Sequence, residues 1–90
     1  MGIRFEWDSD KAAKNLRKHK VSFEEAATVF RDTLSVTVPD PEHSAEEDRY
    51  ITVGLSSRLR LLMVSHTEWG ERIRIIGARE LTHQERKDYG

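Results

Sequence analysis

The sequence contains no cysteine among its 90 residues and only two prolines. The absence of cysteine excludes a disulfide scaffold, a thiol nucleophile, a zinc site built on cysteine and an iron–sulfur centre. No apolar run approaches the about 20 residues that a membrane span needs, and the first residues lack the apolar core of a signal peptide. We therefore expect a single domain over residues 1–90, without a membrane segment and located in the cytoplasm.

Net charge is also nearly absent, because 15 Lys and Arg oppose 16 Asp and Glu for a total of −1. The balance is uneven along the chain: +3 over residues 1–20, −7 over residues 21–48 and +3 over residues 49–90. Such asymmetry concerns binding partners rather than fold. We expect the two basic ends to form one positive patch, with the acidic middle elsewhere.

Two helical segments begin with recognisable caps. Asp8 or Ser9 can cap a helix of about 10–12 residues that ends near Lys20. Ser22 and Glu25 form a capping box, in which the serine accepts from the glutamate amide and the carboxylate reaches back. This box opens a second helix to about residue 30, whose apolar side chains at 23, 26, 27 and 30 share one face.

From residue 34 onward the pattern changes to that of strands. Segments at 34–38, 50–55, 60–66 and 72–78 lie too close in sequence for helical crossovers, so they should be antiparallel neighbours. Residues 3–7 also alternate, and can add a short strand or an extended arm. Thr82 and Glu85 form a second capping box, opening a helix that reaches Tyr89. The sequence predicts an α+β fold: two N-terminal helices packed on a four-stranded antiparallel sheet, with a short C-terminal helix.

Motifs for metals, cofactors and activated nucleophiles are missing. The histidines at 19, 43, 66 and 83 have no metal-ligand spacing, and the chain has no glycine-rich phosphate loop and no nucleophile elbow. We therefore expect no metal and no cofactor. The acidic stretch 40–48 is either a solvated hairpin loop or a partner-facing acidic patch.

Basic side chains concentrate on one helix and on the last strand. Lys11, Asn15 and Lys18 form a stripe that can hold phosphates or can be the ordinary wet face of a helix. Arg72 and Arg74 alternate with isoleucines, so they stand on the exposed side if the isoleucines face the helices.

These residue types suit one chemistry that needs no metal. Cleaving RNA through its own 2′-OH requires a group to take that proton, a group to protonate the leaving 5′-oxygen, and cations to stabilise the phosphorane. Six side chains on or beside the predicted strands and the last helix can supply these roles: His66, Glu68, Arg72, Arg74, Arg79 and Tyr89. Exposed arginines on a sheet often only pair with glutamates, so the residue types alone leave both interpretations open.

Short motifs spaced from residue 7 to residue 89 match those of a known family. In order they are Trp7-Asp8, Lys18-His19, Val21-Ser22-Phe23-Glu24-Glu25-Ala26, Arg49-Tyr50, His66-Thr67, Arg72-Ile73-Arg74-Ile75-Ile76, Ala78-Arg79 and Glu85-Arg86 followed by Tyr89. On these motifs the sequence resembles the BrnT toxins of bacterial type II toxin–antitoxin systems. Lys20 departs from the pattern where the family usually has glycine, and Gly77 where serine is common.

The resemblance implies a RelE-like fold and a ribonuclease toxin that cleaves RNA without a metal and inhibits translation. It also implies neutralisation by a cognate BrnA-like antitoxin, in a complex that binds operator DNA only through the antitoxin. We assign catalysis to His66, Arg79 and Tyr89. We assign RNA contact to Lys18, His19, Arg49, Arg72, Arg74 and Arg86. The alternatives are a non-catalytic module that holds nucleic acid or an acidic peptide on the same basic surface, and a purely structural domain.

Overall fold

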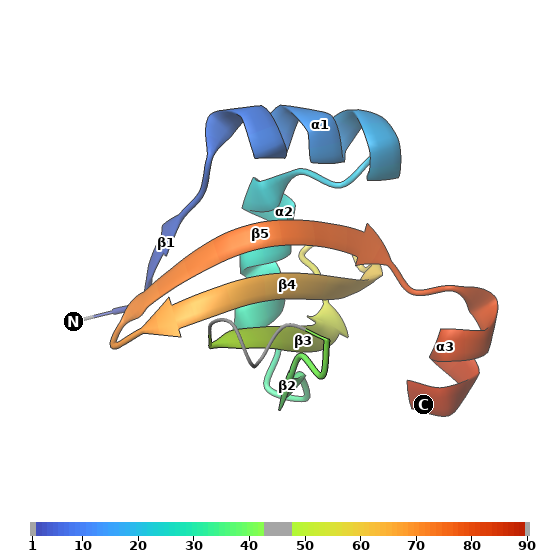
Figure 1. Ribbon diagram of the computed structural model, residues 1–90. Coiled ribbons are helices and arrows are strands. Elements are labelled where there is room, and N and C mark those ends of the chain that lie inside the picture. Colours follow the sequence, from blue (N-terminus) through green and yellow to red (C-terminus); the bar gives the residue numbers. More distant parts are fainter. Residues whose placement is uncertain (1, 43–47, 90) are drawn as a thin grey trace.

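The computed structural model describes residues 2–42 and 48–89, whose strands form a single five-stranded sheet (Figure 1). The elements in chain order are β1 (Arg4–Glu6), α1 (Ser9–His19), α2 (Phe23–Thr28), the 3-10 helix η1 (Val29–Arg31), β2 (Val36–Pro39), β3 (Arg49–Leu55), β4 (Leu61–Trp69), β5 (Arg72–Glu80) and α3 (His83–Tyr89). Most of the acidic stretch expected to form a hairpin loop, residues 43–47, lies outside the described residues. None of the described helices is long and apolar enough to cross a membrane.

The sheet has the strand order β1-β5-β4-β3-β2. Strands β2 to β5 form the antiparallel meander that the sequence predicts. The prediction of a four-stranded antiparallel sheet is nevertheless wrong, because β1 adds a fifth strand that runs parallel to β5, with Arg4 opposite Arg72. The sheet is therefore mixed. Since β1 and β5 come from opposite ends of the chain, this pairing brings the two basic segments side by side.

Helix α2 contacts β5 and η1 contacts β3, so these two cover one face of the sheet, and α1 lies along the β5 edge (Figure 1). The buried apolar core comprises Val21, Phe23, Ala26, Val29, Leu62, Val64, Ile73, Ile75 and Ala78. The predicted apolar face of the second helix supplies the fully buried Phe23 and Ala26 to this core, and its Ala27 and Phe30 pack partly buried against it. Val29 of η1, which was not part of that predicted face, is also fully buried in the core. We call the other side of the sheet the open face. Arg72 and Arg74 project from it, as their alternation with the two core isoleucines predicts.

The helix caps form largely as the sequence indicates. The Asp8 carboxylate accepts from the Lys11 amide at 3.0 Å, and the Ser22 hydroxyl accepts from the Glu25 amide at 3.0 Å. The other half of that capping box does not form. The Glu25 carboxylate is buried and accepts instead from the Arg60 Nε at 2.9 Å and the Ser56 hydroxyl at 2.6 Å. The Arg60 guanidinium thereby holds the pKa of Glu25 below its usual value.

A bulge in β5 changes which side chains reach the open face. Ser65 of β4 pairs with Gly77, but the next residue of β4 pairs with Ile75, so Ile76 is an extra residue. Strict alternation from Arg74 would turn the side chain of residue 79 toward the helices. The bulge reverses the alternation, and Arg79 therefore lies on the same face as Arg72 and Arg74.

Candidate active site on the open face of the sheet

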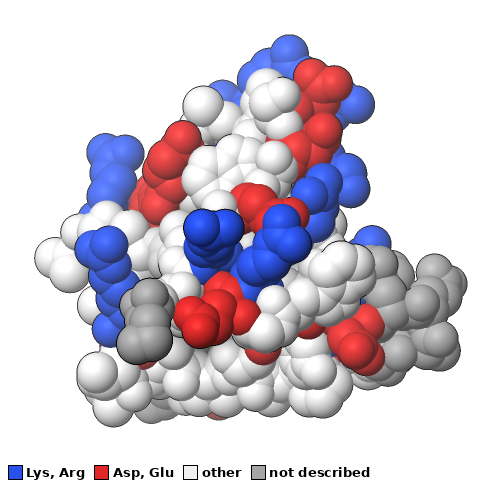
Figure 2. Space-filling model, turned by 90° about the vertical axis from the view of Figure 1, so that its left-hand side faces the viewer, with Lys and Arg blue, Asp and Glu red and all other residues white. Residues whose placement is uncertain are grey.

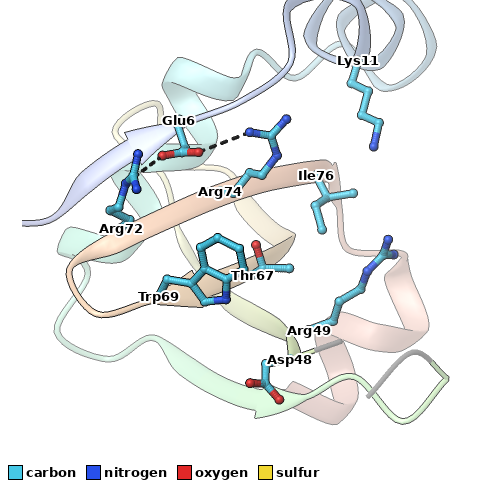
Figure 3. Close-up of a pocket in the computed structure, with 9 residues that line it drawn as sticks. All are labelled: Glu6, Lys11, Asp48, Arg49, Thr67, Trp69, Arg72, Arg74 and Ile76. Carbon is cyan, nitrogen blue, oxygen red and sulfur yellow. Dashed lines mark hydrogen bonds and ion pairs between the residues drawn. The ribbon is translucent and has the colours of Figure 1, made fainter. Parts of the chain in front are cut away.

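Two pockets of the described structure lie on the open face, and the larger is found where β1, α1 and the meander strands meet. Its volume is about 480 Å³. It is lined by Glu6, Lys11, Asp48, Arg49, Thr67, Trp69, Arg72, Arg74 and Ile76 (Figure 3). Three of the residues predicted to contact RNA are therefore brought together here: Arg49, Arg72 and Arg74.

Glu6 organises the cations of this pocket. Its carboxylate lies 3.2 Å from the Arg72 Nε and 3.2 Å from the Arg74 Nη1, so one carboxylate holds two guanidinium groups (Figure 3). Four cationic side chains against two carboxylates leave the lining with a net charge of +2. Lys11 extends from α1 toward the pocket in Figure 3, and it has no ion-pair partner within the described part of the chain.

The acidic side chains are not segregated from the basic ones. Figure 2 shows the face that carries β1 and the β4–β5 turn, where Asp and Glu lie interspersed among Lys and Arg. Glu6 comes from the basic N-terminal segment itself, and Asp48 brings part of the acidic middle to the larger pocket. The expected single positive patch is therefore wrong in detail: the basic ends adjoin, but carboxylates are placed between their cations.

The smaller pocket, of about 190 Å³, continues the first along β4 and β5. It is lined by Asn15, His19, Met63, Ser65, Gly77, Ala78 and Arg79. Thr67 and Ile76 line the larger pocket, while their neighbours on the same face, Ser65 and Gly77, line the smaller one, so the two lie end to end.

Asn15 fixes the helix that carries His19. Its side-chain amide donates to the carbonyls of Val21 and Ala78 at 3.0 and 2.9 Å, and its oxygen accepts from the Ala78 amide at 3.1 Å. The polar stripe of α1 is thus partly turned inward, toward β5. This clamp holds α1 against the strand and so places the His19 imidazole in the same pocket as the Arg79 guanidinium.

Arg79 is held in turn by α3. Both of its outer nitrogens donate to the Glu85 carboxylate, at 2.8 and 3.0 Å. Both halves of the Thr82–Glu85 capping box form as predicted, so the same carboxylate also caps α3. The bonds from Arg79, followed by that from the Thr82 amide, lower the pKa of Glu85 to about 2. Arg79 is therefore a fixed, permanently charged group at the edge of the pocket.

His66 is placed differently from the expectation. It is fully buried on the helix-covered face, where its Nε2 lies 2.7 Å from the Thr52 hydroxyl and its ring packs edge-on against Phe30. Burial lowers its pKa to about 4, so the imidazole is neutral at ordinary pH. The expectation that His66 acts beside Arg79 does not fit this placement, because His66 pairs with Ile75 on the helix-covered face while Arg79 pairs with Met63 on the open face.

The other predicted residues are dispersed. The Tyr89 hydroxyl donates to the Leu34 carbonyl at 3.0 Å and lines neither pocket. Arg86 lies 3.8 Å from Glu80 and is half exposed, and Lys18 is exposed on α1. Among residues 2–42 and 48–89, no three His, Cys, Asp or Glu side chains are grouped so as to hold a metal ion.

Several residues of these pockets were absent from the predicted set of site residues, among them Lys11, Asn15 and Trp69. Lys11 and Asn15 belong to the helix stripe for which the sequence left two interpretations open. Trp69 carried only a weak signal, an aromatic residue next to the turn before Arg72. Alternation counted back from that turn would have placed Trp69 opposite Arg72, which is the observed pairing.

Comparisons with known proteins agree with this architecture. Residues 7–85 match the model of a family described as ribonuclease toxin, BrnT, of type II toxin-antitoxin system. The fold is similar to the crystal structure of the Brucella abortus ribonuclease toxin BrnT, with a TM-score of 0.71 and 19% sequence identity over 90% of this chain and 99% of that chain. A search of curated proteins gives no significant match. Because the family match spans most of the sequence, the chain belongs to the BrnT family of ribonuclease toxins of type II toxin–antitoxin systems.

Proposed function

We propose that this chain cleaves RNA without a metal ion, at the smaller pocket of the open face, and thereby inhibits translation. The observation that carries the proposal is the presence of the His19 imidazole and the Arg79 guanidinium in one pocket of about 190 Å³. We propose both as catalytic residues. His19 therefore takes the proton-transfer role first assigned to His66. For Tyr89 we propose a structural role, in which its hydrogen bond to the Leu34 carbonyl anchors α3.

The chemistry follows from the two side chains. A neutral imidazole can accept the proton of a 2′-hydroxyl as that oxygen attacks the adjacent phosphorus. The imidazolium formed can then return the proton to the 5′-oxygen that leaves, so that the strand ends in a cyclic phosphate and a 5′-hydroxyl. Arg79 can donate to the phosphorane oxygens, and a positioned donor of this kind is worth about 10²–10³ in rate. Fixing by Glu85 supports this role, because a preorganised guanidinium needs no rearrangement.

The larger pocket then holds the rest of the substrate. Its net charge of +2 and its position end to end with the smaller pocket suit the phosphates that flank the cleaved bond. We propose that Arg49, Arg72 and Arg74 contact RNA there, joined by Lys11. We propose that Lys18 and Arg86, which lie outside both pockets, contact the RNA at nucleotides further from the cleaved bond.

The cleavage test compares variants on a short RNA in the presence of EDTA. His19→Ala should lower the rate about 10²- to 10⁴-fold, the usual contribution of acid–base catalysis. Arg79→Ala should lower it about 10²- to 10³-fold. His66→Gln and Lys14→Ala, which change residues outside both pockets, serve as controls and should retain cleavage.

Full activity of both His19→Ala and Arg79→Ala would refute the site, and loss of wild-type activity in EDTA would refute independence from metal. Binding without any cleavage would favour the alternative of a non-catalytic module on the same surface. A cell-free translation assay with the same variants tests the proposed inhibition of protein synthesis, which should follow the rates of cleavage.

The proposal extends to the domain organisation, the cellular location and the antitoxin partner of this chain. We propose that residues 1–90 form one RelE-like domain, since every described strand belongs to one sheet. We also propose a cytoplasmic location, where the RNA target is found, and a BrnA-like antitoxin that covers the open face. Co-expression with the antitoxin should relieve toxicity, and operator DNA should be shifted by the complex but not by this chain alone.

A further inference from the structure

We propose that Trp69 is a stacking platform for an unpaired nucleobase of the RNA, several nucleotides away from the cleaved bond. The inference rests on the proposed RNA target but assigns a new binding residue outside the catalytic pocket. It starts from the most exposed aromatic side chain of the described structure: Trp69 is 74% exposed, although it follows a strand whose alternate residues are buried.

The turn between β4 and β5 presents this indole outward. Trp69 is the last residue of β4 and pairs directly with Arg72, the first residue of β5. Between them Gly70 has a positive φ of 59°, which a glycine adopts without strain and which closes the turn tightly. In Figure 3 the Trp69 ring lies beside Thr67, with its broad side toward the viewer. A flat apolar surface is thus exposed at the end of a hairpin.

The surroundings of the indole are cationic rather than apolar. Of the residues that line the larger pocket, only Ile76 and Trp69 itself are apolar, while four are Lys or Arg. A tryptophan that anchors a protein partner usually sits in a largely apolar, desolvated centre. Proteins that bind single-stranded nucleic acid instead combine aromatic platforms with a positively charged groove. The pocket has the second composition, so RNA is the favoured occupant.

Glu6 adds a positioning element to this arrangement. It holds Arg72 and Arg74 by one nitrogen each, and the other guanidinium nitrogens of both side chains are directed to no other ion-pair partner among the described residues. These nitrogens can meet the phosphates on either side of a base that stacks on Trp69. The stack needs no particular base, because every base has a π-face.

The position of Trp69 along the sheet separates it from the chemistry. Its partner Arg72 and the catalytic Arg79 are seven positions apart on β5, about 20 Å at the usual rise of a strand. A base on Trp69 therefore belongs to a different nucleotide from the one that is cleaved. Trp69 should accordingly affect affinity and KM, and leave kcat nearly unchanged.

The test measures binding separately from cleavage. The probe is a fluorescently labelled 2′-O-methyl RNA of about eight nucleotides, a length within the usual site sizes of single-strand binding domains. It lacks the hydroxyl that cleavage requires. Trp69→Ala should weaken binding about 5- to 150-fold, the usual effect of removing one base–aromatic stack, and Trp69→Phe should restore most of the affinity. Leu59→Ala, at another exposed turn outside both pockets, is the matched control.

Two further readouts identify stacking as the cause. An abasic version of the probe should bind wild type and Trp69→Ala equally. The slope of log affinity against log salt should be the same for wild type and Trp69→Ala, whereas Arg74→Ala should reduce it by about 0.7 for a single strand. Wild-type tryptophan emission should be quenched by the full probe, and Trp69→Phe should lose this response.

Unchanged affinity of Trp69→Ala for the probe would overturn the inference, as would a loss of antitoxin binding in that variant with RNA binding intact. A wild-type protein that binds the probe through Trp69 but does not cleave RNA would refute the proposed catalysis and leave this inference standing. If the protein cleaves RNA but Trp69→Ala changes neither KM nor affinity for the probe, the Trp69 inference is refuted and the proposed catalysis stands.

Discussion

The buried His66 makes a specific prediction about stability and pH. The imidazole is fully buried against Phe30 and accepts or donates one bond with Thr52, and burial lowers its pKa from 6.5 to about 4. In the unfolded chain the same group is solvated and takes up a proton near its ordinary pKa. As pH falls, the unfolded state therefore gains a proton before the folded state does.

The sign and magnitude follow from this difference. Folding stability is unaffected above pH 6.5 and is lost as pH falls from 6.5 toward 4, at up to about 1.4 kcal/mol per pH unit. Between pH 7 and pH 5 the expected loss is about 2 kcal/mol, which corresponds to a fall in melting temperature of about 10 °C for a domain of this size. Carboxylates with lowered pKa, such as Glu25 and Glu85, act at lower pH and do not mask this window.

Urea denaturation at a series of pH values measures the effect. His66→Gln keeps a hydrogen-bonding group for Thr52 but cannot titrate, so it should abolish the loss between pH 6.5 and 5. His83→Gln, on the exposed first turn of α3, removes a histidine without changing the buried site and should keep the loss. Glu68 opposes this lowering of the His66 pKa, because its carboxylate lies 3.4 Å from the His66 Nδ1. That carboxylate is 38% exposed, however, so solvent and salt screen its charge.

A titration of His66 by NMR gives the direct check. A pKa at or above 6.5 would show that Glu68 outweighs burial, and it would refute the reasoning. It would also return His66 to the group of candidate acid–base residues, because a histidine that titrates near neutral pH can exchange protons with a substrate.

The other two predictions concern the contacts that support α1 and α2. Glu25→Gln should lower the free energy of unfolding, measured in urea, by about 2–3 kcal/mol, because it leaves Arg60 and Ser56 without their buried carboxylate partner. This magnitude lies between the values typical of exposed and of buried ion pairs. Glu24→Gln, on the exposed side of the same helix, should change little, and equal losses would contradict the assignment. Lys20→Gly should raise the melting temperature and stabilise the fold by about 0.5–1 kcal/mol, because Lys20 ends α1 in the left-handed region with φ 61°, which glycine adopts without strain. Lys20→Ala should give no such gain, and stabilisation by alanine would show that backbone strain is not the cause.

The elements of the fold were predictable because their signals are local. Caps at Asp8, Ser22 and Thr82 mark the helix starts, and the observed helices begin within a residue or two of them. The spacing of the meander strands required antiparallel neighbours, and the observed pairing agrees. The strand β1 was left undecided because three residues carry too little pattern, and its parallel partner β5 lies more than 65 positions further along the chain.

The candidate site was less predictable because it depends on contacts between distant segments. His66 and His19 are equally plausible in sequence, and only the choice of sheet face and the Asn15 clamp separate them. The Glu25 carboxylate was predicted to reach back within its own helix cap, but its partners Ser56 and Arg60 lie 31 and 35 residues away. Local periodicity shows which residues share a side of one element. It does not show which side another element will cover.

The bulge at Ile76 is the point at which fold and site depend on the same residue. Arg79 lies opposite Met63 on the open face, while its neighbour Ala78 is opposite Val64 in the core. If β5 instead paired continuously through Ile76, the guanidinium would enter that core, where an uncompensated charge costs several kcal/mol, and the small alanine would face solvent. Continuous pairing is the simpler way to build β5, but it would remove the Arg79–Glu85 pair and the cation beside His19. One irregular residue therefore lets the same strand supply isoleucines to the core at one end and the proposed catalytic Arg79 to the opposite face at the other.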